Sequence, residues 1–170
     1  MNRTTYLWMK LGTLHSLAAF PVRALLCIIV VMISSVSDAN EGSQSNERCL
    51  IEFDNGSHIA LPVARTPQAM KHGLMGQQDP GTGIVFVWQA AGIRGIWMKD
   101  TPAPLSAAWI AEDGEVQAVM DLEPMSTQKR SSMRPAIAVI EVPRGTFESL
   151  GVRAGCRIEQ SSCMTLRQDR

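Results

Sequence analysis

The sequence lacks the clustered motifs by which many catalytic and cofactor sites are identified. It contains no Cys-x-x-Cys pair, no Gly-x-Ser-x-Gly turn and no glycine-rich phosphate loop. Their absence argues against a thioredoxin-like redox role and leaves nucleophilic hydrolysis without support. An excess of positive charge is also missing, because 16 basic residues balance 16 acidic ones and the basic residues form no stripe. We therefore expect no nucleic-acid partner, and we assign no cofactor and no metal.

Long apolar runs are scarce as well, and the one that occurs lies near the N-terminus. It covers residues 24–36, and about a dozen residues are too few for a confident membrane span but right for a signal-peptide core. Basic residues precede this run, and the small residues 37–39 follow it. We predict a signal peptide over residues 1–39 and an exported protein, periplasmic or secreted. An uncleaved anchor is the alternative, and membrane contact is expected only through this segment.

The rest of the chain is long enough for one globular domain. Residues 40–48 are polar and predict a flexible leader. The single domain is expected over residues 49–163, with a tail over residues 164–170. A chain of this size buries roughly two-thirds of its unfolded surface and sustains its own core.

Three cysteines fall in the exported part, and the sequence alone does not choose how they pair. They are Cys49, Cys156 and Cys163. Outside the cytoplasm two of them can form a disulfide. A bridge between Cys49 and Cys163 would join the two ends of the domain, and one between Cys156 and Cys163 would close a local loop. Three free thiols remain an alternative.

Short apolar stretches separated by turn residues predict strands along the whole domain. Asn55-Gly56 and Asp113-Gly114 each stand between two such stretches and indicate hairpins. The expected strands are residues 49–53, 59–64, 84–88, 96–98, 105–111, 116–122, 137–142 and 157–159. Strands at intervals of roughly ten residues predict a mainly β (α+β) fold, a small compact antiparallel barrel or sandwich with one or two short helices.

Other local signals place the helices and one irregular strand. Thr66 and Pro67 suit the first positions of a helix and Gly73 suits its end, so residues 67–72 are expected to be helical. Residues 146–150 predict one further helical turn. Pro62 has no amide hydrogen, which predicts an edge or bulged position for its strand.

Five segments occur in an order that resembles one protein family. They are Val63-Ala64-Arg65-Thr66-Pro67, Gly73-Leu74-Met75-Gly76, Gly83-Ile84-Val85-Phe86-Val87, Trp97-Met98-Lys99-Asp100-Thr101 and Glu141-Val142-Pro143-Arg144-Gly145. Together they make residues 49–160 resemble the domain of unknown function 192 (DUF192). The resemblance implies a compact, mostly β fold in a small and often exported protein. It implies no reaction, because none is established for the family.

The chain departs from the pattern of this family at three polar positions. Asp100 stands where the family usually has Asn, Ser106 where it has Asp, and Gln77 where it has a basic residue. If these positions form a polar site in relatives, that site is altered in this chain.

The segment from Trp97 to Thr101 is the richest in polar and aromatic side chains. If it is extended, Trp97 and Lys99 share one face and Met98 the other, so that Lys99 would lie beside a cavity. Glu141 lies in an apolar strand, and an inward carboxylate needs a partner, for which Lys99 is the candidate. Alternatively, Lys99 pairs with an acid such as Asp100, Thr101 caps a turn and Trp97 belongs to the core.

These considerations lead to one set of candidate ligand-binding residues and three functional hypotheses. The candidates are Trp97, Met98, Lys99, Asp100, Thr101 and Glu141, with Trp88 or Trp109 as further walls of a pocket.

The first hypothesis is a binding or accessory module for a small ligand or an envelope component. The alternative is a carboxylate-dependent hydrolase in which Glu141 or Asp100 acts as acid or base and Lys99 stabilises charge. A weaker alternative is periplasmic copper(I) binding by methionines such as Met75 together with His58 or His72.

Overall fold

The computed structural model describes residues 47–167, which form short strands joined by tight turns, and two short helices. Both predicted hairpins are present, with Gly56 at a φ of 79° between the first two strands and Gly114 at a φ of 87° in the second hairpin. The elements are β1 (Arg48–Phe53), β2 (His58–Ala64), α2 (Pro67–His72), β3 (Ile84–Gly92), β4 (Gly95–Ile96), β5 (Leu105–Ile110), β6 (Val116–Leu122), β7 (Arg130–Ser131), β8 (Ala136–Pro143), α3 (Thr146–Ser149) and β9 (Ile158–Ser161).

Helix α2 begins and ends at the predicted residues. The Thr66 hydroxyl accepts a hydrogen bond from the Ala69 amide at 3.1 Å, and Pro67 occupies the first helical position. Gly73 ends the helix at a φ of 49°, and a Cβ there would lie 3.2 Å from the Phe86 ring. Glycine therefore lets the end of α2 lie directly against β3.

Seven strands form one curled sheet, whose two edge strands approach each other only where they begin. The strand order is β6-β5-β8-β3-β2-β1-β9, and β2 and β3 pair in parallel while the other ladders are antiparallel. An isolated bridge between Glu115 and Arg157 joins the β6 and β9 edges, with the Val116 amide donating to the Cys156 carbonyl at 2.8 Å. The result is a half-barrel, which confirms the predicted mainly β, barrel-like fold.

Alternation along the strands produces two hydrophobic cores, one on each face of the curled sheet. We call the first the concave core, because it joins residues from both ends of the strand order, among them Val116 of β6, Ile140 of β8 and Ile158 of β9. The second, the convex core, includes Phe86, Trp109 and Val139 with residues of the segments that cover the outer face of the sheet.

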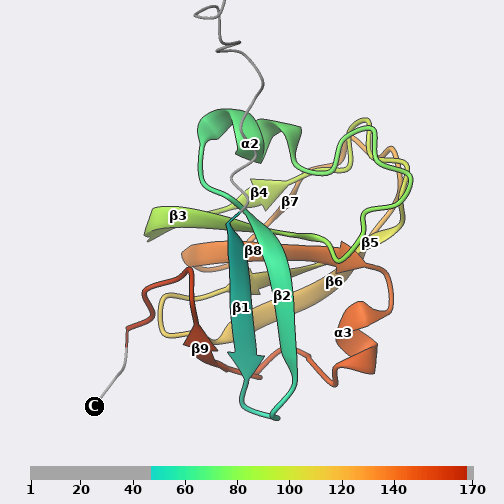
Figure 1. Cartoon of the computed structure of the whole chain (residues 1–170). Coiled ribbons are helices and arrows are strands. Elements are labelled where there is room, and N and C mark those ends of the chain that lie inside the picture. The colour runs from blue at the N-terminus through green and yellow to red at the C-terminus, as the bar shows by residue number, and fades with distance from the viewer. Residues whose placement is uncertain (1–46, 168–170) are drawn as a thin grey trace, which may run out of the picture. The chain divides into compact units, whose positions relative to one another are not determined.

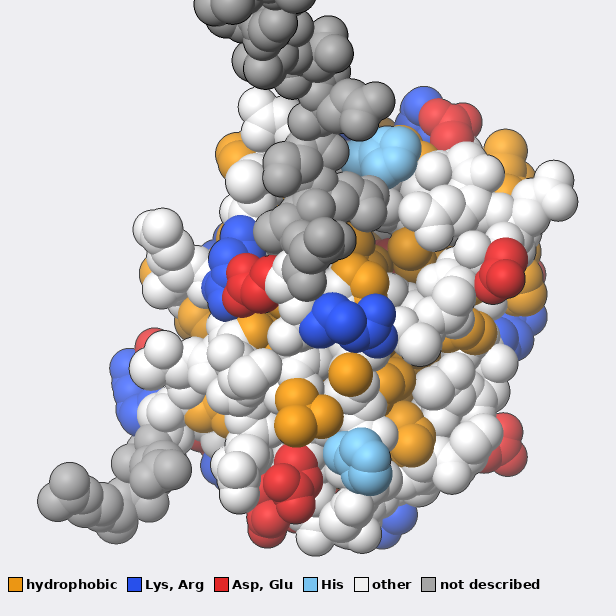
Figure 2. Space-filling model, viewed as in Figure 1, with side chains coloured by type: hydrophobic (Ala, Val, Ile, Leu, Met, Phe, Trp, Pro, Cys, Tyr) orange, Lys and Arg blue, Asp and Glu red, His pale blue; other side chains and the backbone are white. Residues whose placement is uncertain are grey.

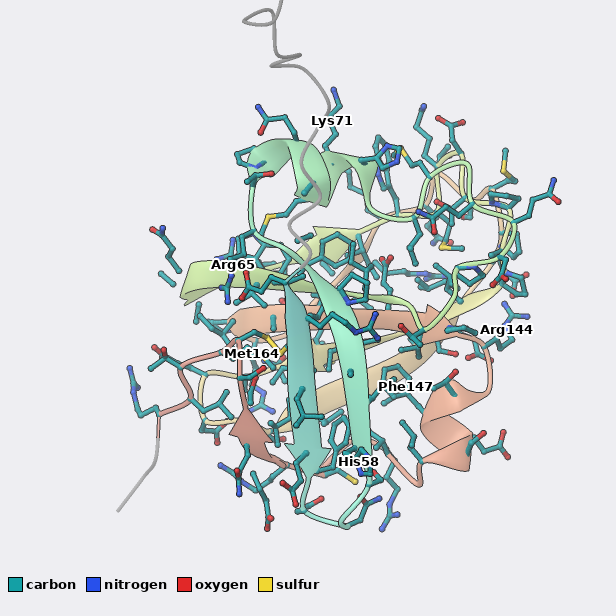
Figure 3. All side chains as sticks on the ribbon, in the orientation of Figure 1. His58, Arg65, Lys71, Arg144, Phe147 and Met164 are labelled. Carbon is teal, nitrogen blue, oxygen red and sulfur yellow. A yellow bond between two sulfur atoms is a disulfide. The ribbon has the colours of Figure 1, made fainter. Side chains whose placement is uncertain are left out.

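Different elements cover the two faces. In Figure 1, α2, β4 and β7 lie together at one end of the sheet and α3 lies at the opposite end. Phe147 of α3 is 2 % exposed and belongs to the concave core, toward which its side chain points in Figure 3. The convex core instead packs against Leu74, which follows α2, and Ile96 of β4.

Two expectations about the strands are wrong. Pro62 lies in β2, which stands inside the sheet between β1 and β3. The proline is tolerated because β2 pairs with β3 only at Val63 and Ala64, so the missing amide hydrogen falls outside that ladder. In addition, the predicted strands leave out β7, which lies between the expected strands over residues 116–122 and 137–142 and pairs with β4 in a separate two-stranded sheet.

The packed domain extends slightly beyond its predicted limits at both ends. Arg48 already belongs to β1, and the Val63 amide donates to the Glu47 carbonyl at 3.1 Å. Met164 is buried in the concave core and the Arg167 amide donates to the Glu112 carbonyl at 2.7 Å, so residues 164–167 are not a free tail.

Two further predictions concern the ends of the chain. The predicted signal peptide, and the leader as far as residue 46, lie outside the described residues. None of the helices within residues 47–167 has the length and apolar character needed to cross a membrane.

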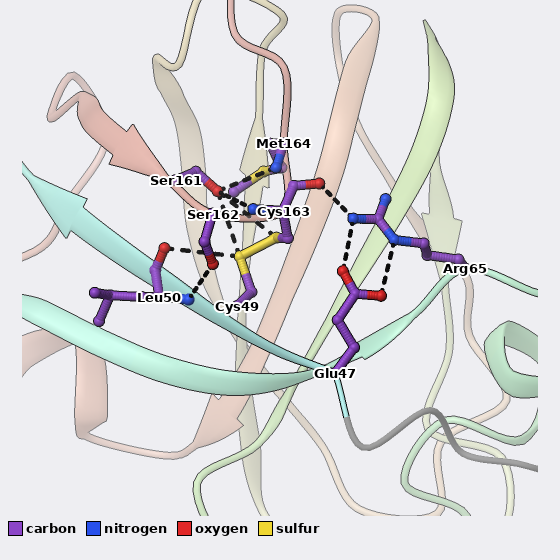
Figure 4. Close-up of a disulfide and its surroundings, with 8 residues drawn as sticks. All are labelled: Glu47, Cys49, Leu50, Arg65, Ser161, Ser162, Cys163 and Met164. Carbon is purple, nitrogen blue, oxygen red and sulfur yellow. Dashed lines mark hydrogen bonds and ion pairs between the residues drawn. A yellow bond between two sulfur atoms is a disulfide. The ribbon is translucent and has the colours of Figure 1, made fainter.

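A disulfide joins the two ends of the domain (Figure 4). It links Cys49 at the start of β1 to Cys163 after β9, residues that are 114 positions apart, and Cys156 is a free, buried thiol. Nearby, Arg65 donates to the Cys163 carbonyl at 2.6 Å and to the Glu47 carboxylate at 3.1 Å. Of the pairings left open by the sequence, the structure has the one between Cys49 and Cys163, which joins β1 to the segment after β9.

Candidate functional site

A cavity of about 240 Å³ opens on the convex face of the sheet, between α2 and the strands beneath it. Its buried lining residues, such as Leu74, Phe86 and Glu141, form the inner part, and exposed residues such as His72 and Trp97 form the rim. We call this space the Glu141 cavity. The lining residues are Met70, Lys71, His72, Gly73, Leu74, Met75, Phe86, Trp88, Gly95, Ile96, Trp97, Thr101 and Glu141.

The position of Glu141 follows from the register of β8 against β3. Glu141 lies opposite Ile84, and two residues before it Val139 belongs to the convex core, so both side chains face the covered outer side of the sheet. Gly83 precedes β3 at a φ of 102°, and a Cβ at this position would lie 2.1 Å from the Glu141 carbonyl oxygen. Only glycine lets the chain enter β3 this close to β8.

The Glu141 carboxyl is buried without a partner. The residue is 5 % exposed, and within residues 47–167 no group forms a hydrogen bond or an ion pair with its side chain. Burial raises the pKa of Glu141 to about 8, because removal from water penalises the charged form. A buried polar group with an unused hydrogen-bonding capacity is costly, so it is a strong indicator of a functional site.

Aromatic rings form the walls near this carboxyl. Phe86 and Trp88 of β3 stack with their ring centroids 6.3 Å apart. The Arg94 guanidinium lies 4.6 Å from the centroid of the Trp88 ring, and the Lys129 ammonium lies 5.7 Å from that of Trp97. The two tryptophans that line the cavity therefore each hold a cation against a ring face.

The loop after α2 and the segment from Trp97 to Thr101 are joined at the cavity by backbone hydrogen bonds. The Gly76 amide donates to the Asp100 carbonyl at 2.7 Å, and the Met125 amide donates to the Thr101 carbonyl at 3.0 Å. Asp100 and Met125 have φ values of 55° and 61°, a conformation that costs energy for residues other than glycine. Segments that are far apart in the sequence are thus held as one wall.

The candidate residues that were predicted from the sequence separate into two groups. Trp97, Thr101 and Glu141 line the cavity. Met98 is 2 % exposed and packs in the convex core. Lys99 and Asp100 are exposed and pair with each other outside the cavity.

The predicted ion pair between Lys99 and Glu141 is not formed. Residues 97–101 make a turn at Asp100 instead of continuing as a strand, so Lys99 points to solvent and binds the neighbouring carboxylate. The Thr101 hydroxyl donates to the Lys99 carbonyl at 3.2 Å and closes this turn. Asp100 and Glu141 do not converge either, because Asp100 does not line the cavity.

Sequence analysis missed most of the wall that α2 provides. Met70 and Met75 line the cavity, and so does Trp88, whereas Trp109 is buried and donates to the Arg94 carbonyl at 3.0 Å. Of the two tryptophans suggested from the sequence as further walls, Trp88 is the one that lines the cavity, because Ile84, Phe86 and Trp88 alternate on the face of β3 that Glu141 shares. Nothing in the sequence indicates that α2 folds back over that face.

Most of the described methionine and histidine residues lie away from the cavity, whereas Met70, His72 and Met75 line it. Of the residues named for copper(I), Met75 and His72 line the cavity, whereas His58 is the first residue of β2. Among the other methionines, Met98 lies in the core, and Met120, Met125 and Met133 are exposed. Among the described residues, no group of three or more His, Cys, Asp or Glu side chains is placed to hold a metal ion.

Three other hollows contain no buried charged side chain. The one beside α3 is lined by Ser106, Asp121 and Arg144, but the Ser106 hydroxyl bonds Asp121 at 2.5 Å and Arg144 pairs with Glu123 at 3.1 Å. The face in Figure 2 shows hydrophobic side chains scattered among polar and charged ones. The Glu141 cavity is therefore the best candidate site.

Comparison with known proteins places the chain in a family. The profile described as "DUF192: Uncharacterized ACR" matches residues 50–160, and the chain belongs to this family. All five segments that carry the resemblance overlap this range, and four of them contribute residues to the Glu141 cavity. No protein with a curated description matches the chain.

Two solved structures share the fold. One, from Sinorhizobium meliloti 1021 and described as a candidate transcription regulator, is 29% identical with a TM-score of 0.63, covering 71% of this chain and 97% of that one. The other, a protein of unknown function from Novosphingobium aromaticivorans DSM 12444, is 23% identical with a TM-score of 0.59, covering 66% of this chain and 84% of that one. The second likeness concerns the fold alone.

Proposed function

We propose that the protein is an exported binding module of the cell envelope, and that it holds a small ligand in the Glu141 cavity. The observation that carries the proposal is the buried Glu141 carboxyl, which lines a cavity and has no partner within residues 47–167. Such a group is retained at a cost to stability, and a ligand that hydrogen-bonds it removes that cost. Export rests on the N-terminal apolar segment and is supported by the disulfide.

The chemistry of the cavity favours binding over hydrolysis. A hydrolase with two carboxylates needs both of them at one cleft, whereas Glu141 is the one carboxylate among the lining residues. Seven of the lining side chains are apolar or aromatic and four are polar or charged, namely Lys71, His72, Thr101 and Glu141. Apolar walls with a small number of placed polar groups are usual in small-ligand sites. A volume of about 240 Å³ is below the range of roughly 300–1,000 Å³ for drug-sized ligands, so the ligand is small.

The description of the Sinorhizobium structure gives little support for DNA binding by this chain. A helix-turn-helix reads the major groove with a recognition helix that follows another helix closely. The described residues contain α2 with 6 residues and α3 with 4, separated by most of the sheet.

Intrinsic tryptophan fluorescence tests the proposal, because Trp88 and Trp97 line the cavity. The purified protein is screened against small cationic, neutral and anionic metabolites, with thermal shift as a second readout. We expect at least one compound to change the emission and raise the Tm. Glu141→Gln should weaken that binding at least tenfold, whereas Glu159→Gln, the same change on the exposed face of β9, should not.

Tryptophan substitutions show which ring causes the change in emission on ligand binding. In Trp97→Phe the change in emission should shrink, while the Tm shift should persist if the ring serves only as part of the wall. Binding that is unaffected by Glu141→Gln, or a complete screen without any hit, would refute the cavity as the functional site.

A further inference from the structure

We propose that the ligand of the Glu141 cavity is a small primary amine, bound through its ammonium group to Glu141 and Thr101. This inference rests on the proposed binding function and adds the chemical class of the ligand. It is drawn from the hydrogen-bonding capacity that the protein leaves unused, the character of the walls and the size of the space.

The inner part of the cavity offers acceptors. In its ionised form Glu141 contributes two acceptor oxygens that no described group occupies. Thr101 is 4 % exposed, and its hydroxyl hydrogen is used by the Lys99 carbonyl, so its oxygen can only accept. Two buried acceptors are matched by a ligand with several N–H donors, which a primary ammonium supplies.

The positive groups of the protein do not neutralise this carboxyl. Lys71 and His72 of α2 stand at the rim, and Lys71 extends away from the sheet in Figure 3. Lys99 is paired with Asp100 outside the cavity. The place of a counter-ion at Glu141 is therefore left to the ligand.

The walls suit a cation with a short apolar chain. Trp88 and Trp97 already hold Arg94 and Lys129 against their rings, which indicates that cations are favoured at these ring faces. The thioether side chain of Met70 completes an apolar wall on the α2 side. An anionic ligand would instead place a second negative group against the ionised Glu141 carboxyl, and the basic groups of α2, Lys71 and His72, stand at the rim.

A primary amine is distinguished from a quaternary one by its donors. A quaternary ammonium would contact the aromatic rings but has no N–H to donate, so the Glu141 carboxyl would stay buried without a hydrogen bond, which is costly. A neutral alcohol offers a single donor and no charge. The volume of the cavity, about 240 Å³, restricts the apolar part of the amine ligand to a few carbon atoms.

Ionisation of Glu141 makes amine binding dependent on pH. The pKa of about 8 leaves the carboxyl largely protonated at neutral pH in the empty cavity. An ammonium needs the ionised form, so binding releases a proton, while an alkylamine stays protonated up to about pH 10, like lysine. The titratable and charged groups that face the cavity are Lys71 and His72 of α2, with Arg94 and Lys129 at the outer rings.

The test is isothermal titration of the purified protein with n-butylamine, n-butanol, butyltrimethylammonium and butyrate, which share one chain and differ in the head group. We expect n-butylamine to bind at least tenfold more tightly than the other three. Its affinity should rise about 50-fold between pH 6 and pH 8, in line with the ionised fraction of Glu141. Near pH 7, titration in buffers of different ionisation enthalpy should show close to one proton released per amine bound.

Two variants provide the controls. Glu141→Gln should abolish both the preference for n-butylamine and its pH dependence, and Glu159→Gln should change neither. Tighter binding of n-butanol or butyrate that is lost in Glu141→Gln would overturn the amine inference and leave the proposed binding function standing. Equal binding of n-butylamine to wild type and Glu141→Gln would overturn the amine inference, and absence of any Glu141-dependent ligand in the wider screen would overturn both.

Discussion

The concave core and the convex core differ most in whether a buried polar group lies among their apolar side chains. The concave core is lined by apolar side chains from strands at both edges of the sheet, and it includes the two cysteines of the disulfide. The convex core contains Glu141 without a partner and opens into a cavity with Trp97 at its rim, 40% exposed. One sheet therefore presents a face that stabilises the fold and another that gives up stability around a cavity.

Backbone conformation follows the same division. The two residues other than glycine with positive φ, within residues 47–167, are Asp100 and Met125, and both lie in the loops that cover the convex side. Strained residues of this kind cluster at functional sites, because the surrounding structure holds them in place. The comparison predicts that substitutions on the two faces will affect stability and binding differently.

Removing the disulfide should give the largest loss of stability. A cross-link between residues 114 positions apart restricts the unfolded chain and contributes about 4–5 kcal/mol in the chain-entropy view. We expect Cys49→Ala combined with Cys163→Ala to lower the free energy of unfolding by that amount, measured by urea denaturation. Ligand binding by the folded fraction should be unchanged, and a loss of binding in protein that is still folded would contradict the division between the two faces.

Gly83→Ala should combine a loss of stability with damage to the site. The added Cβ would lie 2.1 Å from the Glu141 carbonyl and the φ of 102° disfavours alanine, so we expect a cost of about 3 kcal/mol or more. The matched control is Gly81→Ala, at a φ of 56° but with open space around it, which should cost about 1 kcal/mol. Thermal melts of both variants decide this, and equal losses would show that crowding at β8 is unimportant.

Glu141→Gln should remove a pH dependence of stability. The folded-state pKa of about 8 exceeds the ordinary 4.5, so the native protein binds the proton more tightly than the unfolded chain. Stability is therefore greatest below the unfolded pKa and falls as the pH rises from 4.5 through 8, by about 3 kcal/mol between pH 5 and pH 7.5. Denaturation at both pH values should show this fall in wild type and lose most of it in Glu141→Gln. An equal fall in both proteins would show that other groups cause it.

Much of the fold could be predicted from the sequence because its signals are local. Turn dipeptides such as Asn55-Gly56 determine hairpins, and Thr66 with Pro67 starts α2, since each acts within a few residues. The parallel pairing of β2 with β3 and the short β4–β7 sheet depend on contacts between distant segments. Sequence alone provides no local signal for these.

The candidate site was predictable only in part for the same reason. Trp97, Thr101 and Glu141 were identified because a charged or aromatic residue in an apolar stretch is conspicuous in the sequence. The predicted pairing of Lys99 with Glu141 was wrong because residues 97–101 were treated as a strand. In the structure the chain turns at Asp100, and the Asp100 carboxylate pairs with the Lys99 ammonium. Met70 and Met75 reach the cavity only because α2 folds over β3.

The smallest effect is expected for substitutions of Asp100. The backbone of this residue helps to hold the wall of the cavity together, whereas its side chain lies outside the cavity. Asp100 has a φ of 55°, a conformation in which asparagine is tolerated well, and its ion pair with Lys99 is exposed and worth at most about 0.5 kcal/mol. Asp100→Asn should therefore leave the Tm within a few degrees of wild type or raise it slightly. Asp100→Val should lower stability by more than about 1 kcal/mol, because a β-branched residue is strained there.

A binding measurement shows whether the Asp100 side chain takes part in the site. Because the Asp100 side chain lies outside the cavity, Asp100→Asn should bind n-butylamine as wild type does, with the same pH dependence. A loss of binding at unchanged Tm would place the carboxylate in the site and contradict the geometry described for this wall. The backbone of Asp100, which accepts a hydrogen bond from the Gly76 amide, is kept by both variants, so the comparison tests the side chain alone.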